Sequence, residues 1–119
     1  MVKANELRIG NRLLCEGKEI IVNGIYDNSL YCNLSKYNKY FFKEYIDYFE
    51  PIRLTDKLLL SLHVTKNTFE SYSFGIIKLY YKKKFKYFAV YIDVNYLTQI
   101  EYLHELQNLY FAINGTELI

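Results

Sequence analysis

The sequence of 119 residues contains no tryptophan, one proline, two cysteines and five glycines. Cys15 and Cys32 have no close spacing and both lie in apolar alternations, which favours buried free thiols over a disulfide or a metal pair. The glycines are dispersed, so no glycine-rich loop that cradles phosphate is present. No apolar run approaches the roughly 20 residues of a membrane-spanning helix, and the first six residues lack the apolar core of an export signal. We therefore expect a cytoplasmic protein with no cofactor and no membrane partner.

The composition is that of a folded chain, because 51% of the residues are apolar and can form one core. The length predicts a single domain over residues 1–119. The net charge of +2 argues neither for nor against a nucleic-acid partner. Lys, Asn, Ile, Tyr and Phe supply 56 of the 119 residues, the bias that an AT-rich genome produces. The positions of the fourteen tyrosines are therefore more informative than their number.

The first half of the sequence predicts short antiparallel strands. Residues 12–16 and 19–25 form a hairpin around Gly17 and Lys18, where glycine in the first central position suits a type II′ turn. Residues 30–34 alternate as a third strand, and the aromatic segment 40–49 is a candidate fourth strand. These strands predict a small bent sheet, SH3-like in form.

The only proline, Pro51, marks the joint to the second half. Thr55 is suited to cap a short helix, and residues 74–82 and 85–94 form a long hairpin. Its loop has two or four residues, and four is favoured because Lys-Lys suits a type I′ turn poorly. A closing helix follows over residues 102–113, with Asn114 and Gly115 as its stop. The predicted fold is therefore a single α+β domain whose closing helix packs one apolar stripe onto the sheet: Leu103, Leu106, Tyr110 and Ile113.

The long hairpin has two predicted faces, because side chains alternate along a strand. Its core face holds Ile77, Leu79, Phe88 and Val90. The opposite face is the best candidate binding surface, and its candidate residues are Lys78, Tyr80, Lys82, Tyr87 and Tyr91. Aromatic rings beside lysines stack nucleic-acid bases and neutralise phosphates. The same pattern also fits a subunit or partner interface, or a plain solvated sheet face.

Four further candidates are polar residues near the two ends of the chain. His104, Gln107 and Asn108 share one face of the closing helix, and the Arg8 fork suits a carboxylate or phosphate. A catalytic histidine needs a nucleophile or carboxylate in reach, and no serine or cysteine stands in a nucleophile context. No metal-ligand spacing is present either. A structural role for His104, and no enzymatic activity, are therefore the predictions.

Three segments together resemble a family of small bacteriophage and prophage proteins of gut bacteria. Residues 4–11 read ANELRIGN, residues 51–55 read PIRLT, and residues 104–112 read HELQNLYFA. The resemblance implies an α+β fold and a phage origin, and it implies no known activity. Small phage proteins are commonly accessory factors that bind host proteins or host signalling molecules.

The prediction from these observations is a non-enzymatic phage accessory protein of the host cytoplasm, with a role in counter-defence. Its expected partner is a nucleotide-type signal, which it sequesters, or a host protein, which it blocks. It is expected to form a homo-oligomer. The alternative is a nucleic-acid-binding module that uses the Tyr and Lys hairpin face, which the small net charge disfavours.

Overall fold

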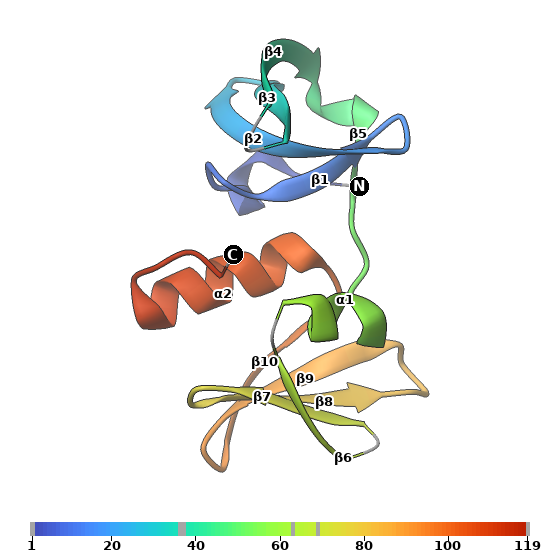
Figure 1. The fold of residues 1–119 in the computed structure, drawn as a ribbon, viewed down its shortest axis with the longest axis vertical. Coiled ribbons are helices and arrows are strands. Elements are labelled where there is room, and N and C mark those ends of the chain that lie inside the picture. Colours follow the sequence, from blue (N-terminus) through green and yellow to red (C-terminus); the bar gives the residue numbers. More distant parts are fainter. Residues whose placement is uncertain (1, 36–37, 63, 69, 119) are drawn as a thin grey trace. The chain divides into compact units, whose positions relative to one another are not determined.

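The computed structural model describes residues 2–35, 38–62, 64–68 and 70–118 of the chain (Figure 1). Its mixed α+β content, with two antiparallel sheets, confirms the predicted fold class. The elements are η1 Ala4–Glu6, β1 Arg12–Cys15, β2 Lys18–Tyr26, β3 Ser29–Ser35, β4 Asn38–Tyr45, η2 Ile46–Tyr48, β5 Phe49–Pro51, α1 Asp56–Ser61, β6 Thr65–Thr68, β7 Ser71–Phe74, β8 Ile77–Lys82, β9 Tyr87–Ile92, β10 Asn95–Ile100 and α2 Leu103–Asn114. No helix in these ranges is both long and apolar enough to span a membrane.

The chain groups into two compact units by the contacts among its residues. The first unit contains the chain up to Arg53 together with Tyr102–Leu118, and thus β1–β5 and α2. The second unit contains Leu54–Glu101, and thus α1 and β6–β10. The single domain expected from the length stays a prediction.

The first sheet has the strand order β4-β3-β2-β1-β5. Strands β1 to β4 form an antiparallel meander, and a fifth strand, β5, returns to pair with β1, with Leu14 opposite Glu50. The short 3-10 helix η2 stands between β4 and β5. The predicted small antiparallel sheet is present, and its SH3-like form stays a prediction. The single strand predicted over 40–49 is wrong in one respect, because η2 divides that segment into two strands with different partners.

The turn of the first hairpin differs from the prediction. Cys15 pairs with Lys18, so the two-residue loop is Glu16 and Gly17 rather than Gly17 and Lys18. Both loop residues have positive φ, at 51° and 80°, which is the signature of a type I′ turn and not of type II′. The shift moves the register by two residues, and the predicted inward and outward faces are preserved.

The core of the first unit comes from alternate positions of its strands. Val2, Leu13, Ile20, Val22, Leu30, Cys32 and Phe49 form one buried cluster. Burial raises the pKa of the Cys32 thiol to about 12, and both cysteines are free, as predicted. Cys32 is therefore a packing residue that stays protonated at neutral pH.

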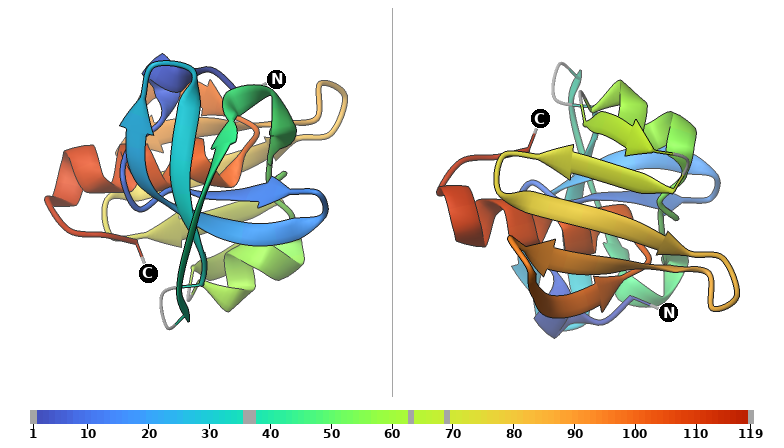
Figure 2. Two further views of the ribbon diagram at one scale, coloured as in Figure 1. Left: turned by 90° about the horizontal axis from the view of Figure 1, so that it is seen from above. Right: turned by 90° about the horizontal axis from the view of Figure 1, so that it is seen from below.

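The second sheet has the order β10-β9-β8-β7-β6 and is seen face-on in the right view of Figure 2. Its centre is the predicted hairpin: β8 pairs with β9 through a four-residue loop, with Lys82 opposite Tyr87. The predicted core residues Ile77, Leu79, Phe88 and Val90 are all buried. Strands β6, β7 and β10 were not predicted. Gly75, with a φ of 58°, lies in a tight turn between β7 and β8. Phe74 therefore ends β7, and the strand predicted over 74–82 begins only at Ile77.

Thr55 caps α1 as the sequence predicts. Its Oγ1 accepts a hydrogen bond of 3.1 Å from the backbone N–H of Leu58. Because a helix leaves its first N–H groups without internal partners, we expect Thr55→Ala to lower the free energy of unfolding by about 1 kcal/mol. Urea denaturation measures the change. Thr55→Ser keeps the accepting hydroxyl and is expected to stay within about 0.5 kcal/mol of the native chain.

Candidate functional site

The hairpin surface chosen from the sequence is present on the second sheet. The Tyr–Lys face consists of six side chains on one side of three strands: Lys78, Tyr80 and Lys82 on β8, Tyr87 and Tyr91 on β9, and Tyr96 on β10. The register sets Lys78 opposite Tyr91 and Tyr91 opposite Tyr96. The structure therefore brings the five predicted residues together and adds Tyr96 to them.

Three tyrosines of this face form a row of ring contacts across the sheet. The Tyr80 and Tyr91 centroids are 5.3 Å apart with an interplanar angle of 86°, and those of Tyr91 and Tyr96 are 5.6 Å apart at 71°. These are edge-to-face pairs, the arrangement that aromatic quadrupoles prefer. Tyr80 is 37% exposed and Tyr96 is 56% exposed. The row is therefore held in place by its own contacts while offering aromatic surface to solvent.

The chain's positive charge is concentrated beside these rings. Residues 54–101 contain seven lysines against four carboxylates, whereas the rest of the chain has eight basic and nine acidic residues. Four of the lysines lie at the β8–β9 turn, within residues 82–86. Lys78 and Lys82 are exposed and have no carboxylate partner in the described ranges. The small net charge of +2 is therefore unevenly distributed, and lysines gather beside the aromatic row.

The amide stripe of α2 binds the start of the chain. The Gln107 side chain accepts from the backbone N–H of Arg12 at 2.9 Å and donates to the carbonyl of Gly10 at 3.2 Å. The Asn108 side chain donates to the Glu6 carbonyl and accepts from the Asn11 side chain, both at 2.8 Å. These hydrogen bonds lie within the first unit and satisfy backbone groups of the segment before β1. Gln107 and Asn108 therefore use their amides internally.

Arg8 is also engaged within its own unit. Its guanidinium makes a two-pronged ion pair with Glu117, at 2.6 and 3.0 Å. The same group lies over the Phe111 ring, 4.2 Å from the centroid. The Arg8 guanidinium thus binds the carboxylate of Glu117 in its own chain. This ion pair links the C-terminal segment to the loop before β1.

His104 is buried on the same helix, with only 1% of its surface exposed. Its ring stacks on that of Tyr102 at 6.0 Å, and its Nε2 lies 3.5 Å from the Glu6 carboxylate, which is longer than a good hydrogen bond. Burial lowers the pKa of His104, and the nearby charges of Glu6 and Glu105 only partly oppose this effect. The imidazole is therefore neutral at pH 7.

This burial makes the stability of the chain depend on pH. Above the ordinary histidine pKa of about 6.5, His104 is neutral in both the folded and the unfolded chain. As the pH falls below that value, the unfolded chain takes up the proton first, so the free energy of unfolding falls. Denaturation in urea between pH 7.5 and 5 measures the slope, and His104→Gln is expected to reduce it. An unchanged slope in that variant contradicts the inference.

Two residues that the sequence interpretation missed are central to these arrangements. Asn11 is fully buried and joins Arg8 to Asn108. The sequence signal was an asparagine directly after Gly10 and directly before the first strand. Tyr96 lies in β10, a strand that was not predicted, and a bulge between Tyr96 and Thr98 interrupts the alternation of that strand. Within residues 2–35, 38–62, 64–68 and 70–118, no three His, Cys, Asp or Glu side chains form a group that fits a metal ion.

The two longest segments of the phage-family resemblance meet in the first unit. Residues 4–11 form η1 and the loop before β1, residues 104–112 lie on α2, and the amide hydrogen bonds described above join them. A mutual structural role thus accounts for several of their polar residues, and the resemblance itself stays a prediction. No protein-family model, no curated protein and no solved structure matches the chain.

Proposed function

We propose that this chain is a non-enzymatic binding protein that takes a nucleotide-type ligand on the Tyr–Lys face. The observation that carries the proposal is the row of Tyr80, Tyr91 and Tyr96, which are in ring contact across three strands. Its two outer rings, Tyr80 and Tyr96, are exposed to solvent. Every nucleic-acid base has a π-face that such rings can stack on, whatever its sequence. The unpaired Lys78 and Lys82 beside the row supply charge for the phosphates.

The openness of the face favours a single strand over an isolated nucleotide. A small-molecule site encloses most of its ligand, whereas an exposed sheet face touches a ligand from one side. A strand makes up for this by stacking several bases along the row and placing several phosphates against the lysines. The basic patch in residues 54–101 also reverses the argument that the small net charge disfavours nucleic acid. We therefore propose single-stranded nucleic acid as the ligand.

The biological setting of the proposal comes from the phage-family resemblance. It supports an accessory protein of the host cytoplasm, acting in counter-defence. Sequestration of a nucleotide signal and the blocking of a host protein are the two mechanisms that the resemblance suggests. A homo-oligomer is part of the same proposal, and light scattering on the purified chain measures it.

The salt dependence of binding tests the proposal. We expect a fluorescent oligothymidylate of about 12 nucleotides to bind, with log K falling by about 0.7 per log unit of salt for each phosphate contacted. Lys78→Gln and Lys82→Gln are each expected to reduce that slope by about 0.7. Lys18→Gln, an exposed lysine of the first unit, is the matched control and is expected to leave the slope unchanged.

Calorimetry with cyclic and ADP-ribose-type nucleotides separates the two ligand classes. Binding of the oligonucleotide with a steep slope supports the proposal as stated. If only a small nucleotide binds, the ligand of the Tyr–Lys face is a nucleotide signal and not a single strand. Absence of both at 50 mM salt overturns the proposal.

A further inference from the structure

The β8–β9 turn carries a second aromatic pair beside the Tyr–Lys face. Phe85, in the turn, stacks on Tyr87 with the ring centroids 5.8 Å apart and an interplanar angle of 18°. Because Tyr87 belongs to the Tyr–Lys face, this contact sets the Phe85 ring against that face. Phe85 nevertheless stays 62% exposed. The pair therefore offers aromatic surface that the row of Tyr80, Tyr91 and Tyr96 does not include.

The backbone of the turn holds this ring in place. The N–H groups of Phe85 and Lys86 both donate to the carbonyl of Lys82, at 3.0 and 2.8 Å. In Figure 2 the turn, in light orange, extends beyond the neighbouring strands of its sheet. The ring is therefore both fixed and accessible, which reduces the entropy that a ligand loses on binding there.

The charge around the pair has one sign. Residues 71–92 contain five lysines and no carboxylate. Lys83 and Lys84 are exposed, and neither forms an ion pair with a described residue. The Lys84 ammonium lies 5.7 Å from the Phe85 ring centroid. A nucleotide needs an aromatic surface for its base and a cation for its phosphate, and the turn supplies both.

We propose that Phe85 and Tyr87, with the lysines of the turn, form a second stacking subsite for the same single strand. This inference rests on the proposed function and adds the length of its ligand. Tyr87 and Tyr91 are four residues apart on β9, which is about 13 Å. At the roughly 3.4 Å spacing of a stacked strand, about four nucleotides cover that distance. A strand of about six or more nucleotides therefore reaches both the row and the turn, whereas a trinucleotide reaches one of them.

The composition of the turn also fits a loop that binds an anionic lipid surface. Insertion into a bilayer needs an apolar side chain directed away from the protein, whereas the Phe85 ring is stacked on Tyr87. Ile76 and Val94, which are 55% and 89% exposed, lie in the turns at the other ends of β8 and β9. Because the exposed aliphatic side chains and the lysines lie at opposite ends of the strands, nucleic acid is favoured over lipid.

Oligothymidylates of two lengths test the subsite in the variant Phe85→Ala. Losing one stacked base is expected to weaken a strand of about 12 nucleotides at least fivefold, measured by fluorescence anisotropy. The trinucleotide, which the row binds, is expected to stay within about twofold, measured by nuclear magnetic resonance titration. Phe85→Tyr keeps the ring and is expected to bind both lengths within about twofold of the native chain.

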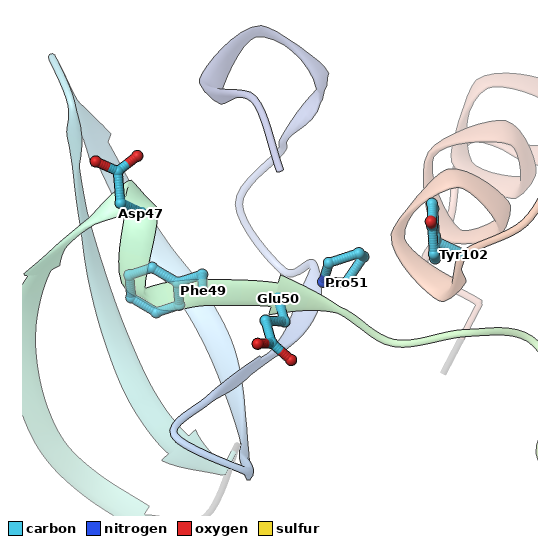
Figure 3. A pocket seen from close by; sticks show the side chains of 5 residues that line it. All are labelled: Asp47, Phe49, Glu50, Pro51 and Tyr102. Atoms are coloured by element: carbon cyan, nitrogen blue, oxygen red, sulfur yellow. The ribbon is translucent and has the colours of Figure 1, made fainter. Parts of the chain in front are cut away.

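Tyr48→Ala is the matched control. Tyr48 is 53% exposed on η2. The nearby Asp47 and Glu50 line a pocket beside β5, with their carboxylates on either side of the strand (Figure 3). These charges repel phosphates, so the variant is expected to leave both affinities unchanged.

The outcomes separate this inference from the proposed function. If no oligonucleotide binds at 50 mM salt, both are wrong. If the long strand binds but Phe85→Ala leaves its Kd within twofold, or weakens both lengths equally, the second subsite alone is wrong. It is also wrong if phosphatidylserine vesicles sediment the native chain but not Phe85→Ala while the oligonucleotide affinity is unchanged, because the turn then binds lipid.

Discussion

Replacing Tyr80 and Tyr91 together by alanine is expected to weaken the binding of a single-stranded oligonucleotide by about 30-fold or more. Each stacked base contributes about 1–3 kcal/mol, and 1.4 kcal/mol corresponds to a factor of ten in Kd. Two lost rings therefore cost at least about 2 kcal/mol of binding free energy. Because Tyr91 also contacts Tyr96, its removal frees the third ring from its edge contact. Fluorescence anisotropy at constant salt measures the loss.

The first sheet provides a matched control for this double variant. Tyr26 and Tyr45 are 70% and 63% exposed and flank the same residue, Ser29, in the register. Tyr26→Ala with Tyr45→Ala removes more exposed aromatic surface than the loss of Tyr80 and Tyr91 and is expected to leave the affinity unchanged. Tyr80→Phe with Tyr91→Phe keeps the stacking surface and is expected to bind within about twofold of the native chain. An equal loss in the two alanine double variants would show that the Tyr–Lys face is not the binding surface.

The faces of the hairpin were predictable because a strand has a period of two. Alternation of Ile77 and Leu79 with Lys78 and Tyr80 assigns the core face whatever the loop length, provided that the loop is even. The loop has four residues, with Lys82 opposite Tyr87, and every side chain lies on the face that the alternation predicts. This local rule needs no knowledge of the rest of the fold, and it explains why five residues of the Tyr–Lys face were identified from the sequence.

Local rules of this kind predicted neither the face of Tyr96 nor the hydrogen-bond partners of Gln107 and Asn108. Strand β10 was not predicted, and a bulge in it interrupts the alternation by which Tyr96 could have been assigned to the face. The helical period correctly gathered Gln107 and Asn108 into one stripe, but their partners are backbone groups 95 to 102 residues away in the chain. Periodicity tells which side chains share a surface, and only the tertiary fold tells what that surface meets.

Asn11→Ala is expected to lower the free energy of unfolding by about 2 kcal/mol, because two half-buried partners lose their hydrogen bonds to it together. The Asn11 side chain accepts from the backbone N–H of Arg8 at 2.7 Å and donates to the Asn108 side chain at 2.8 Å. Asn11 itself is fully buried, and alanine leaves the Arg8 N–H and the Asn108 amide oxygen without this partner. Because both are only half-buried, we take the lower end of the penalty, about 1 kcal/mol each. Since domains of this size are stable by about 5–15 kcal/mol, the change removes a large share of the total. Urea denaturation measures it.

Two comparisons distinguish the loss of the Asn11 hydrogen bonds from a general effect of replacing an asparagine. Asn28→Ala, at an exposed turn position, is expected to stay within about 0.5 kcal/mol of the native chain. In a double-mutant cycle of Asn11→Ala with Asn108→Ala, the two losses are expected to overlap by 0.5 kcal/mol or more, because the residues share one hydrogen bond. Strictly additive losses would mean that the amide stripe does not hold the N-terminal segment. The polar face of α2 would then again be open to a binding role, because its amides would have no essential partner within the first unit.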